Sequence, residues 1–217
     1  MRSEKSARHD SLYFNVELAA PPELHDLVIN LQPKLNLPEN VYYLPGTVLC
    51  PVHLTLYSTF SSRKAIDLMI GALKQTVGKY EPIWVKIEGI GCFVDGSIYL
   101  KCERSAPLIM LHEEIVRILS PLRDVIHPPS ELAGELTREQ IERFIEVGDP
   151  FALDHFVPHV TIVSVDSYEK AMQLAGELPR VKVDVAFQEI AARIWRSLSP
   201  KSTTAVFKSL LRKAPGG

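Results

Sequence analysis

The sequence predicts an α+β fold, with short strands and amphipathic helices in alternation along its 217 residues. Apolar residues recur at every second position in some segments, as in half-buried strands. They recur at three- and four-residue spacing in the segments between these, as in helices. One strand pattern also occurs twice, and each copy is followed by a helix pattern and then by two strand patterns. A chain of this length can bury a core without disulfide bonds.

The repeated pattern is a His-x-Thr triplet set between apolar and β-branched residues. It occurs at 53–55 within a strand pattern and again at 159–161 within another. Because residues two apart on a strand point to the same face, His53 and Thr55 share a face, and so do His159 and Thr161. One such triplet can arise by chance, whereas two copies embedded in strands indicate a function.

The first strand and the first helix precede the first triplet. Residues 11–18 alternate as a strand, and the proline pair at 21–22 starts a helix that runs to about residue 35. Prolines and a glycine between 38 and 46 then predict a loop into the strand that carries His53.

Between the two triplets, the sequence predicts two helices separated by a hairpin. Apolar residues at helical spacing predict helices over 64–80 and 107–122. The hairpin pairs strands at 83–88 and 97–102 around the turn signal Asp95-Gly96.

Residues 127–150 differ in character from the chain around them. They contain a proline pair, an acidic stretch and a short helix that has a capping box at Thr137 and Gln140 and ends at Gly148. We expect an insertion that leaves the core, and an insertion of this kind beside an active site can act as a lid.

After the second triplet we expect a helix over 167–178 and two closing strands, 181–195 and 203–210, with a Ser199-Pro200 turn between them. The segments 1–10 and 211–217 lie outside every predicted element. They are expected to be flexible tails of a single domain that spans 1–217.

Charge and cysteine content limit the possible classes of function. The net charge is −2, from 24 Lys and Arg against 26 Asp and Glu, so we expect no long duplex nucleic acid as a partner. Cys50, Cys92 and Cys102 lack the spacing of a zinc site or of a disulfide framework, which favours free thiols in the cytoplasm. The polar start and the lack of a long apolar run predict neither export nor contact with a membrane.

The triplets and their surroundings carry a resemblance to a known family. Residues 53–56 and 156–162 resemble the two signature motifs of the 2H phosphoesterase superfamily. Within it, the chain is most similar to the bacterial RNA 2′,3′-cyclic phosphodiesterase branch, also called 2′-5′ RNA ligase-like. The segment 87–93 is similar to the family's stretch between the motifs, and the similarity spans roughly residues 12–210. The triplets are somewhat farther apart than in that branch, which we attribute to the insertion at 127–150.

The resemblance implies a bilobal fold, with two antiparallel sheets and outer helices around a central cleft. The lobes would be related by a pseudo-twofold axis, and each would contribute one His-x-Thr triplet to the cleft. Four polar groups could then converge on one anion, which a single copy could not achieve.

The resemblance also implies a phosphoric diester hydrolase that opens 2′,3′-cyclic phosphates of RNA ends or nucleotides. His53 and His159 would serve as the acid–base pair, and Thr55 and Thr161 would bind the phosphate oxygens. No metal or other cofactor is expected, because these four groups include no carboxylate and hydroxyl groups are poor zinc ligands. The expected partner is a small nucleotide or a short RNA end, and the protein is expected to be a monomer.

Two other functions stay open at this point. The same fold could cleave or form 2′-5′ linkages, including those of small oligonucleotide or cyclic dinucleotide signals. Alternatively, the chain could be a nucleotide- or RNA-binding module without catalysis, although all four His and Thr residues are intact.

Other residues are secondary candidates. Tyr57 shares the parity of His53 and Thr55, so we expect its ring to contact the substrate. The aromatic residues expected in the core are Phe93, Tyr99, Trp195 and Phe207. The basic residues that could contact a phosphate are Lys101, Arg193 and Arg196, and strand parity does not choose among them. The histidines without an expected role in the reaction are His25, His112, His127 and His155.

Overall fold

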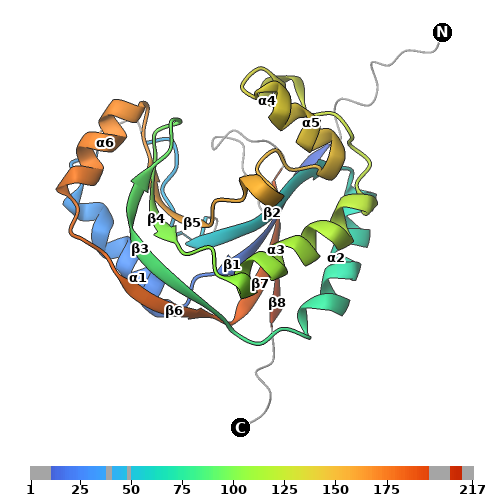
Figure 1. The fold of residues 1–217 in the computed structure, drawn as a ribbon, viewed down its shortest axis with the longest axis horizontal. Helices are drawn as coiled ribbons and strands as arrows, with labels where there is room; N and C mark the ends of the chain where they lie inside the picture. Colours follow the sequence, from blue (N-terminus) through green and yellow to red (C-terminus); the bar gives the residue numbers. More distant parts are fainter. Residues whose placement is uncertain (1–10, 38–40, 48–49, 196–205, 212–217) are drawn as a thin grey trace.

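The fold is built on a curled antiparallel sheet of eight strands, counted over the residues that the structure describes (Figure 1). The structure is a computed structural model that describes residues 11–37, 41–47, 50–195 and 206–211. The strand order is β6-β3-β4-β5-β2-β1-β7-β8, and every neighbouring pair is antiparallel. The strands are β1 (Leu12–Ala19), β2 (His53–Ser61), β3 (Ile83–Cys92), β4 (Ser97–Cys102), β5 (His159–Ser164), β6 (Val183–Phe187), β7 (Glu189–Trp195) and β8 (Val206–Leu211).

Two halves of four strands make up this sheet. One half is β6-β3-β4-β5 and the other is β2-β1-β7-β8, and they meet where Leu54 of β2 pairs with Val160 of β5. The two expected antiparallel sheets are therefore joined edge to edge into one. The predicted α+β, bilobal architecture is confirmed, and each half supplies one His-x-Thr strand at the junction.

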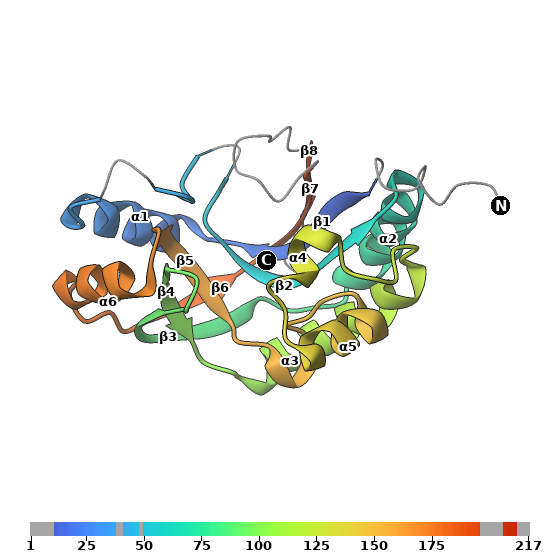
Figure 2. The same cartoon turned by 90° about the horizontal axis from the view of Figure 1, so that it is seen from above.

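The helices cover the two halves separately (Figures 1 and 2). Helices α1 and α6 pack on the half that contains β3, β4 and β5, whereas α2 and α3 pack against each other on the side of β2. The helices of the described chain are α1 (Pro22–Leu31), α2 (Arg63–Val77), α3 (Ala106–Leu119), α4 (Ser130–Ala133), α5 (Arg138–Val147) and α6 (Tyr168–Glu177). In this part of the chain, none of them has the length and apolar character needed to cross a bilayer.

Local sequence signals account well for where elements begin and end. The capping box of Thr137 and Gln140 is formed, and α5 ends at Gly148 in the left-handed region at φ 87°. The segment 127–150 contains α4 and α5 and supplies no strand to the sheet. Of the predicted tails, 1–10 and 212–217 lie outside the described residues, and Leu211 is the last residue of β8.

The expectation of one strand over 181–195 is wrong. The segment forms β6 and β7 with a break at Gln188, and the two strands serve different halves of the sheet. β6 pairs with β3, whereas β7 pairs with β1. A continuous β pattern in the sequence does not show that its two ends have different partners, since pairing is decided by the rest of the fold. The predicted closing strand begins at Val206 in the structure, and 203–205 lie outside the described residues.

Beyond the junction, the edge of β2 is covered by side chains instead of a strand. The buried carboxylate of Asp149 accepts hydrogen bonds from the backbone N–H of Ser58 at 2.9 Å and from its hydroxyl at 3.2 Å. His112 of α3 lies next to this edge. Its Nδ1 is 2.6 Å from the Leu56 carbonyl oxygen, and its Nε2 accepts the Leu153 N–H at 2.8 Å. An edge covered in this way cannot pair with another chain.

These contacts define the protonation state of His112. A carbonyl oxygen only accepts, so Nδ1 carries the proton, and Nε2 must be unprotonated to accept from Leu153. The ring is also buried and stacks on Phe156, with ring centroids 4.0 Å apart. Burial lowers the pKa of His112, which agrees with a neutral ring. His112 therefore has a structural role that the sequence did not indicate.

We expect His112→Ala to lower the free energy of unfolding by about 3 kcal/mol, because it removes a stacked buried ring and leaves two backbone groups unpaired. The contribution of the native ring should be complete above its ordinary pKa of 6.5 and should decline as the pH falls below that value, since the unfolded chain then binds more protons. Urea denaturation between pH 5 and 8 measures both effects. His25→Ala, at a side chain that is 40% exposed, is the control and should change stability by less than about 0.5 kcal/mol.

Candidate active site

The junction of β2 and β5 brings the two His-x-Thr triplets side by side. Because the strands are antiparallel and Leu54 pairs with Val160, His53 lies beside Thr161 and Thr55 lies beside His159. Leu54 and Val160 are fully buried, whereas the four polar side chains on the opposite face are each partly exposed. From above, β2 and β5 lie in the middle of the molecule, between the two groups of helices (Figure 2).

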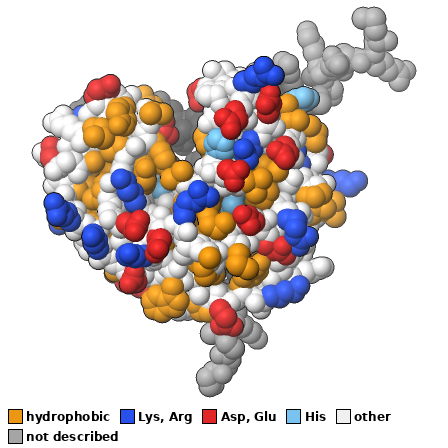
Figure 3. All heavy atoms as spheres, viewed as in Figure 1, with side chains coloured by type: hydrophobic (Ala, Val, Ile, Leu, Met, Phe, Trp, Pro, Cys, Tyr) orange, Lys and Arg blue, Asp and Glu red, His pale blue; other side chains and the backbone are white. Residues whose placement is uncertain are grey.

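The same face carries further polar residues on the neighbouring strands. In the register, Lys101 and Tyr99 of β4 lie beside His159 and Thr161, and Glu17 of β1 lies beside Thr55. The space-filling view shows a notch in the surface between the α6 side and the α4–α5 side of the molecule (Figure 3). The two triplets thus form the centre of a polar row that crosses the sheet.

The two imidazole rings are held in the same way. His53 Nδ1 is 2.8 Å from the carbonyl oxygen of Pro51, and His159 Nδ1 is 2.8 Å from that of Val157, in each case two residues earlier. Since a carbonyl can only accept, Nδ1 is the protonated nitrogen in both neutral rings. Each Nε2 is then the nitrogen that can accept or donate a proton at the site. This equivalence supports the pseudo-twofold relation of the two motifs.

The surroundings of His53 are buried and charged. Its Nε2 lies 3.7 Å from Glu17 Oε2, and the other oxygen of Glu17 contacts the guanidinium group of Arg193 on β7. Asn15 donates to Glu17 Oε2 at 3.0 Å. Burial, assisted by the charge of Arg193, lowers the pKa of His53 to about 4. Burial raises the pKa of Glu17 to about 8, although Arg193 and Asn15 oppose that rise.

The surroundings of His159 are aromatic. Phe93 and Tyr99 stack on each other with centroids 4.0 Å apart, and both present an edge-type contact to the His159 ring, at 4.8 and 5.4 Å. Burial lowers the pKa of His159, and the charge of a protonated His53 would lower it further. The hydrogen bond to Val157 and the carboxylate of Asp95 act in the opposite direction.

Tyr57 is placed differently from the expectation. Its ring is fully buried, and its hydroxyl donates to the Val147 carbonyl oxygen at 2.6 Å. The expectation assumed that side chains alternate without a break along β2. In the structure, Val16 of β1 pairs with Tyr57 and the next residue, Glu17, pairs with Thr55, so Leu56 is left without a partner in β1. This β-bulge moves Tyr57 to the core face. Tyr57 is therefore a structural residue, and the prediction that it contacts substrate is wrong.

The other candidates separate clearly by position. Of the basic residues, Arg193 is buried against Glu17, Lys101 is exposed on the polar row, and Arg196 lies outside the described residues. Tyr99 is buried as expected, but Phe93 and Trp195 are only partly buried, and the side chain of Phe207 lies outside the description. His155 Nε2 lies 2.9 Å from Glu139, away from the triplets.

Two buried polar residues at the site, Asn15 and Glu17, were not recognised in the sequence. They stand two residues apart in an otherwise apolar strand, which is the same alternation that made the His-x-Thr triplets visible. That signal was present, but nothing in the sequence showed that this strand would lie next to His53.

The segment 127–150 stands at one side of the notch (Figures 1 and 3). Helix α5 is anchored, since Phe144 and Val147 are buried and Asp149 bonds to β2. The short helix α4 projects beyond it. A lid function for this segment stays a prediction.

Among the described residues, no group of three or more His, Cys, Asp and Glu side chains is arranged to hold a metal ion. The donors at the centre are two imidazoles and two hydroxyl groups, a set suited to hydrogen bonding with an oxyanion.

The chain resembles known proteins in sequence family and in fold. The family model described as the 2′-5′ RNA ligase superfamily matches residues 21–199. No curated protein matches the chain in sequence.

Three solved structures illustrate the fold. A phosphoesterase shares 15% identity, with a TM-score of 0.59 over 94% of this chain and 100% of its own. TT0787 of Thermus thermophilus shares 17% identity, with a TM-score of 0.59 over 91% of this chain and 94% of its own. LigT of E. coli, complexed with 3′-AMP, shares 16% identity, with a TM-score of 0.57 over 94% of this chain and 99% of its own. At these identities the likeness shows a common fold.

We expect Tyr57→Phe to lower the free energy of unfolding by about 1 kcal/mol, because the buried Val147 carbonyl loses its donor. Chemical denaturation measures the change. Tyr42→Phe is the control, since Tyr42 is 58% exposed, and it should have no measurable effect. Equal stability of Tyr57→Phe and the native protein would contradict the structural assignment of Tyr57.

Proposed function

Because this chain belongs to the 2′-5′ RNA ligase superfamily, a family of 2H phosphoesterases with phosphodiesterase or ligase activity, we propose that it hydrolyses the 2′,3′-cyclic phosphate of RNA ends or nucleotides. The observation that carries the proposal is the register of β2 against β5, which sets two imidazoles and two threonine hydroxyls on one face. Each imidazole also has its Nδ1 bound to a carbonyl and its Nε2 available.

The chemistry that these groups can perform is an in-line displacement at phosphorus. One Nε2 takes a proton from water as the water oxygen bonds to phosphorus, and the other Nε2 gives a proton to the ribose oxygen whose bond to phosphorus breaks. The product is a 2′- or 3′-phosphomonoester. The hydroxyls of Thr55 and Thr161 donate to the non-bridging oxygens, where negative charge increases in the transition state.

The side chains at the site can perform this reaction without a cofactor. The two proton carriers are imidazoles, and hydroxyl groups stabilise the phosphate oxygens in place of a Lewis acid. We therefore propose that turnover is independent of metal ions.

Size and charge favour a small substrate. The net charge of −2 suits a nucleotide or a short RNA end better than long nucleic acid. The stacked Phe93–Tyr99 pair beside His159 offers an aromatic surface for a base. The α4–α5 segment would restrict access from the other side.

A second candidate is cleavage or formation of 2′-5′ linkages, which the description of the matching family favours. Both functions need the same acid–base pair, so the substrate distinguishes them. A panel of 2′,3′-cyclic mononucleotides and a 2′-5′ dinucleotide, assayed with EDTA present, tests the proposal. Hydrolysis of the cyclic phosphates supports it. Turnover of the dinucleotide alone, or activity that requires an added divalent ion, would contradict it.

We expect His53→Ala and His159→Ala each to lower turnover of a cyclic phosphate by at least about 100-fold, because each removes one proton carrier. The double variant should be hardly worse than either single one, since the pair acts as a unit. Thr55→Val and Thr161→Val should each cost about 1 to 3 kcal/mol of transition-state stabilisation. Steady-state kinetics measures these changes, and Tyr57→Phe is the control that should keep its turnover. A His53→Ala variant with most of its activity would refute the mechanism.

A second prediction concerns Lys101. The Lys101 side chain passes close to Gly91, because a Cβ atom placed on Gly91 would lie 2.6 Å from Lys101 Cε. Among the described residues, Lys101 forms no ion pair. The cation on the polar row next to His159 is thus available for a second phosphate of the substrate. Lys86 serves as the control, because its Nζ lies 3.8 Å from Glu88 Oε1 and so already forms an ion pair.

We expect Lys101→Met to raise KM about fivefold for a cyclic nucleotide that also carries a 5′-phosphate. This change corresponds to the loss of one exposed ion pair, which contributes about 1 kcal/mol to binding. The KM of the nucleoside 2′,3′-cyclic phosphate should stay unchanged, and Lys86→Met should alter neither value. An equal rise of KM for both substrates would show that Lys101 does not bind a second phosphate.

A further inference from the structure

Two helices that pack beside the β2–β5 junction each bring one buried polar side chain to it. Gln32 is the residue directly after α1, which packs on β5, and His112 lies in α3, which packs on β2. Both side chains are buried. Buried polar side chains in folded proteins are nearly always hydrogen-bonded, so the partners of these two residues show what they hold in place.

Gln32 joins the strand of the second triplet to the segment that precedes the first. Its Nε2 donates one hydrogen bond to the carbonyl oxygen of Ile162 at 3.0 Å and another to that of Pro45 at 2.8 Å. Ile162 directly follows the Thr of the second triplet, whereas Pro45 lies in the segment before β2. One side-chain amide thus holds two parts of the chain that are far apart in sequence.

His112 makes the corresponding connection in the other half. Its Nδ1 donates to the carbonyl oxygen of Leu56 on β2 at 2.6 Å, and its Nε2 accepts the N–H of Leu153 at 2.8 Å. Leu56 directly follows the Thr of the first triplet, and Leu153 lies in the turn before β5. The link therefore runs from the strand of the first triplet to the segment that precedes the second. The pseudo-twofold relation of the triplets extends to these two side chains, although the residue types differ.

The carbonyl groups that accept these bonds belong to two β-bulges. Leu56 is the extra residue of β2 opposite β1, and Ile162 is the extra residue of β5 opposite β4. The extra residue of a bulge is left unpaired in the ladder, so its carbonyl group is open to a side chain. Because each bulge directly follows a Thr of the site, a bond to its carbonyl group also restrains the peptide beside that Thr.

The other end of the His112 link restrains the chain that leads into the second triplet. The turn Leu153–His155 is followed by Val157, whose carbonyl oxygen lies 2.8 Å from His159 Nδ1. The backbone of Leu153 has a φ of 58°, a left-handed conformation that is costly for a residue with a Cβ atom. Such a conformation persists only where neighbouring contacts hold it, and the bond to His112 is one of them. Without that bond, the turn can relax and move the carbonyl group that orients His159.

We propose that Gln32 and His112 are positioning residues for the reaction, each of which holds the His of one triplet relative to the Thr of the other. Gln32 acts on the first His and the second Thr, and His112 acts on the second His and the first Thr. Both act through the backbone. In-line displacement needs the two imidazoles at defined places around phosphorus, and a misplacement of about 1 Å can lower turnover about 100-fold. The effect on turnover rests on the proposed cyclic phosphodiester hydrolysis, whereas the effect on geometry does not.

The first test is the kinetics of variants that lose these bonds but keep the volume of the side chain. His112→Phe keeps a ring that can stack on Phe156, as the native ring does at 4.0 Å, but it bonds to neither backbone group. Gln32→Met likewise fills its site without a donor. We expect each variant to lower kcat on a nucleoside 2′,3′-cyclic phosphate by about 10- to 100-fold, with KM changed by less than about twofold, because the proton carriers move while the substrate still binds.

A conservative variant separates positioning from packing. His112→Gln supplies one donor and one acceptor in place of the two ring nitrogens, although it lacks the ring. Its kcat should therefore stay within about threefold of the native value. A kcat as low as that of His112→Phe would overturn the proposal for His112.

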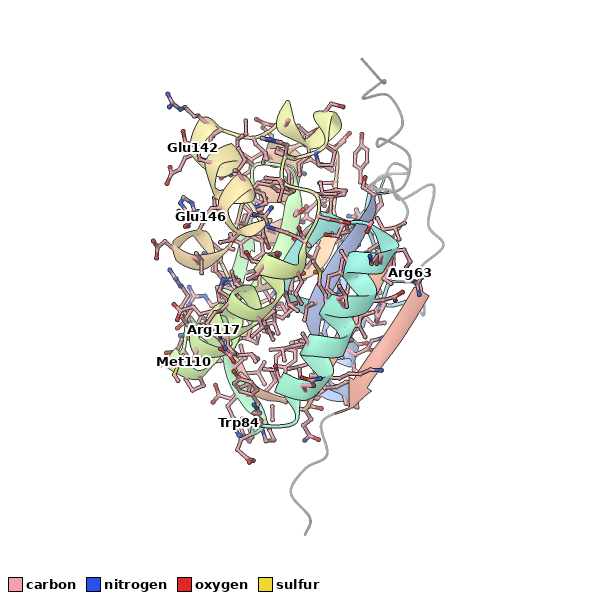
Figure 4. The ribbon with its side chains drawn as sticks, turned by 90° about the vertical axis from the view of Figure 1, so that its right-hand side faces the viewer. Arg63, Trp84, Met110, Arg117, Glu142 and Glu146 are labelled. Atoms are coloured by element: carbon pink, nitrogen blue, oxygen red, sulfur yellow. The ribbon has the colours of Figure 1, made fainter. Side chains whose placement is uncertain are left out.

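Two control variants match the loss of a buried bond and the location on α3. Tyr57→Phe also deprives a buried carbonyl group of its donor, but that carbonyl belongs to Val147 and leads to neither triplet. It should lower stability and keep kcat. Arg117→Met changes the same helix as His112 on its outer face, where the Arg117 side chain is 69% exposed (Figure 4), and should also keep kcat. A loss of kcat in Gln32→Met and His112→Phe no larger than in these controls would overturn the proposal.

NMR of the imidazole Nδ1–H groups tests the geometry without substrate and separates this inference from the proposed function. In the native protein both groups are bonded to carbonyl oxygens and should give separate signals, assigned with His53→Gln and His159→Gln. Gln32→Met should broaden or remove the His53 signal and keep that of His159, and His112→Phe should do the reverse. This pattern without any turnover of cyclic phosphates would reject the proposed substrate and keep the inference.

The same spectra also show how the proposal fails. Two unchanged signals in both variants would overturn it, because the links would then not hold the rings. Loss of both signals in each variant would overturn it as well, since that result indicates a general loosening of the fold. If one variant folds poorly, the other tests the same kind of link in the opposite half.

Discussion

The antiparallel contact between β2 and β5 is the constraint on which the site depends. One pair of fully buried residues, Leu54 and Val160, joins the two halves of the sheet at this point. Because side chains alternate, burying these two residues turns both His-x-Thr triplets to the other face. A slip of one residue would bury the imidazoles and expose the apolar residues. The energy that holds the core together therefore also holds the site in register.

The contact is short, and other groups secure the strands that make it. Past the junction, no strand of the described chain pairs with this edge of β2, and Asp149 and His112 bind its backbone groups there. On the other side, Tyr43 pairs with Ser164 next to the end of β5. This arrangement also explains why a histidine of α3 is buried and neutral.

Burying charged side chains is energetically costly, and among the described residues the buried Glu17–Arg193 pair lies beside His53. Glu17, Asn15 and Arg193 satisfy one another in part, so the cost is limited. What remains is a lasting electrostatic difference between two motifs that have similar sequences and backbone contacts. The two imidazoles thus share their backbone contacts and differ in their electrostatic surroundings.

The sequence alone determined the class of fold, the two triplets, the capping of α5 and the shared face of His and Thr within each triplet. These features depend on spacing along a few residues, and periodicity is a local property. The tertiary structure decided which strands are neighbours. It divided 181–195 between two halves of the sheet, shifted Tyr57 into the core through a bulge, and brought Arg193 and Glu17 together under His53. Glu17 and Arg193 are far apart in the sequence, and no local pattern in either strand records its partner. Pairing across a sheet is set by the burial of the whole core, and for that reason the environment of each histidine became visible only in the folded chain.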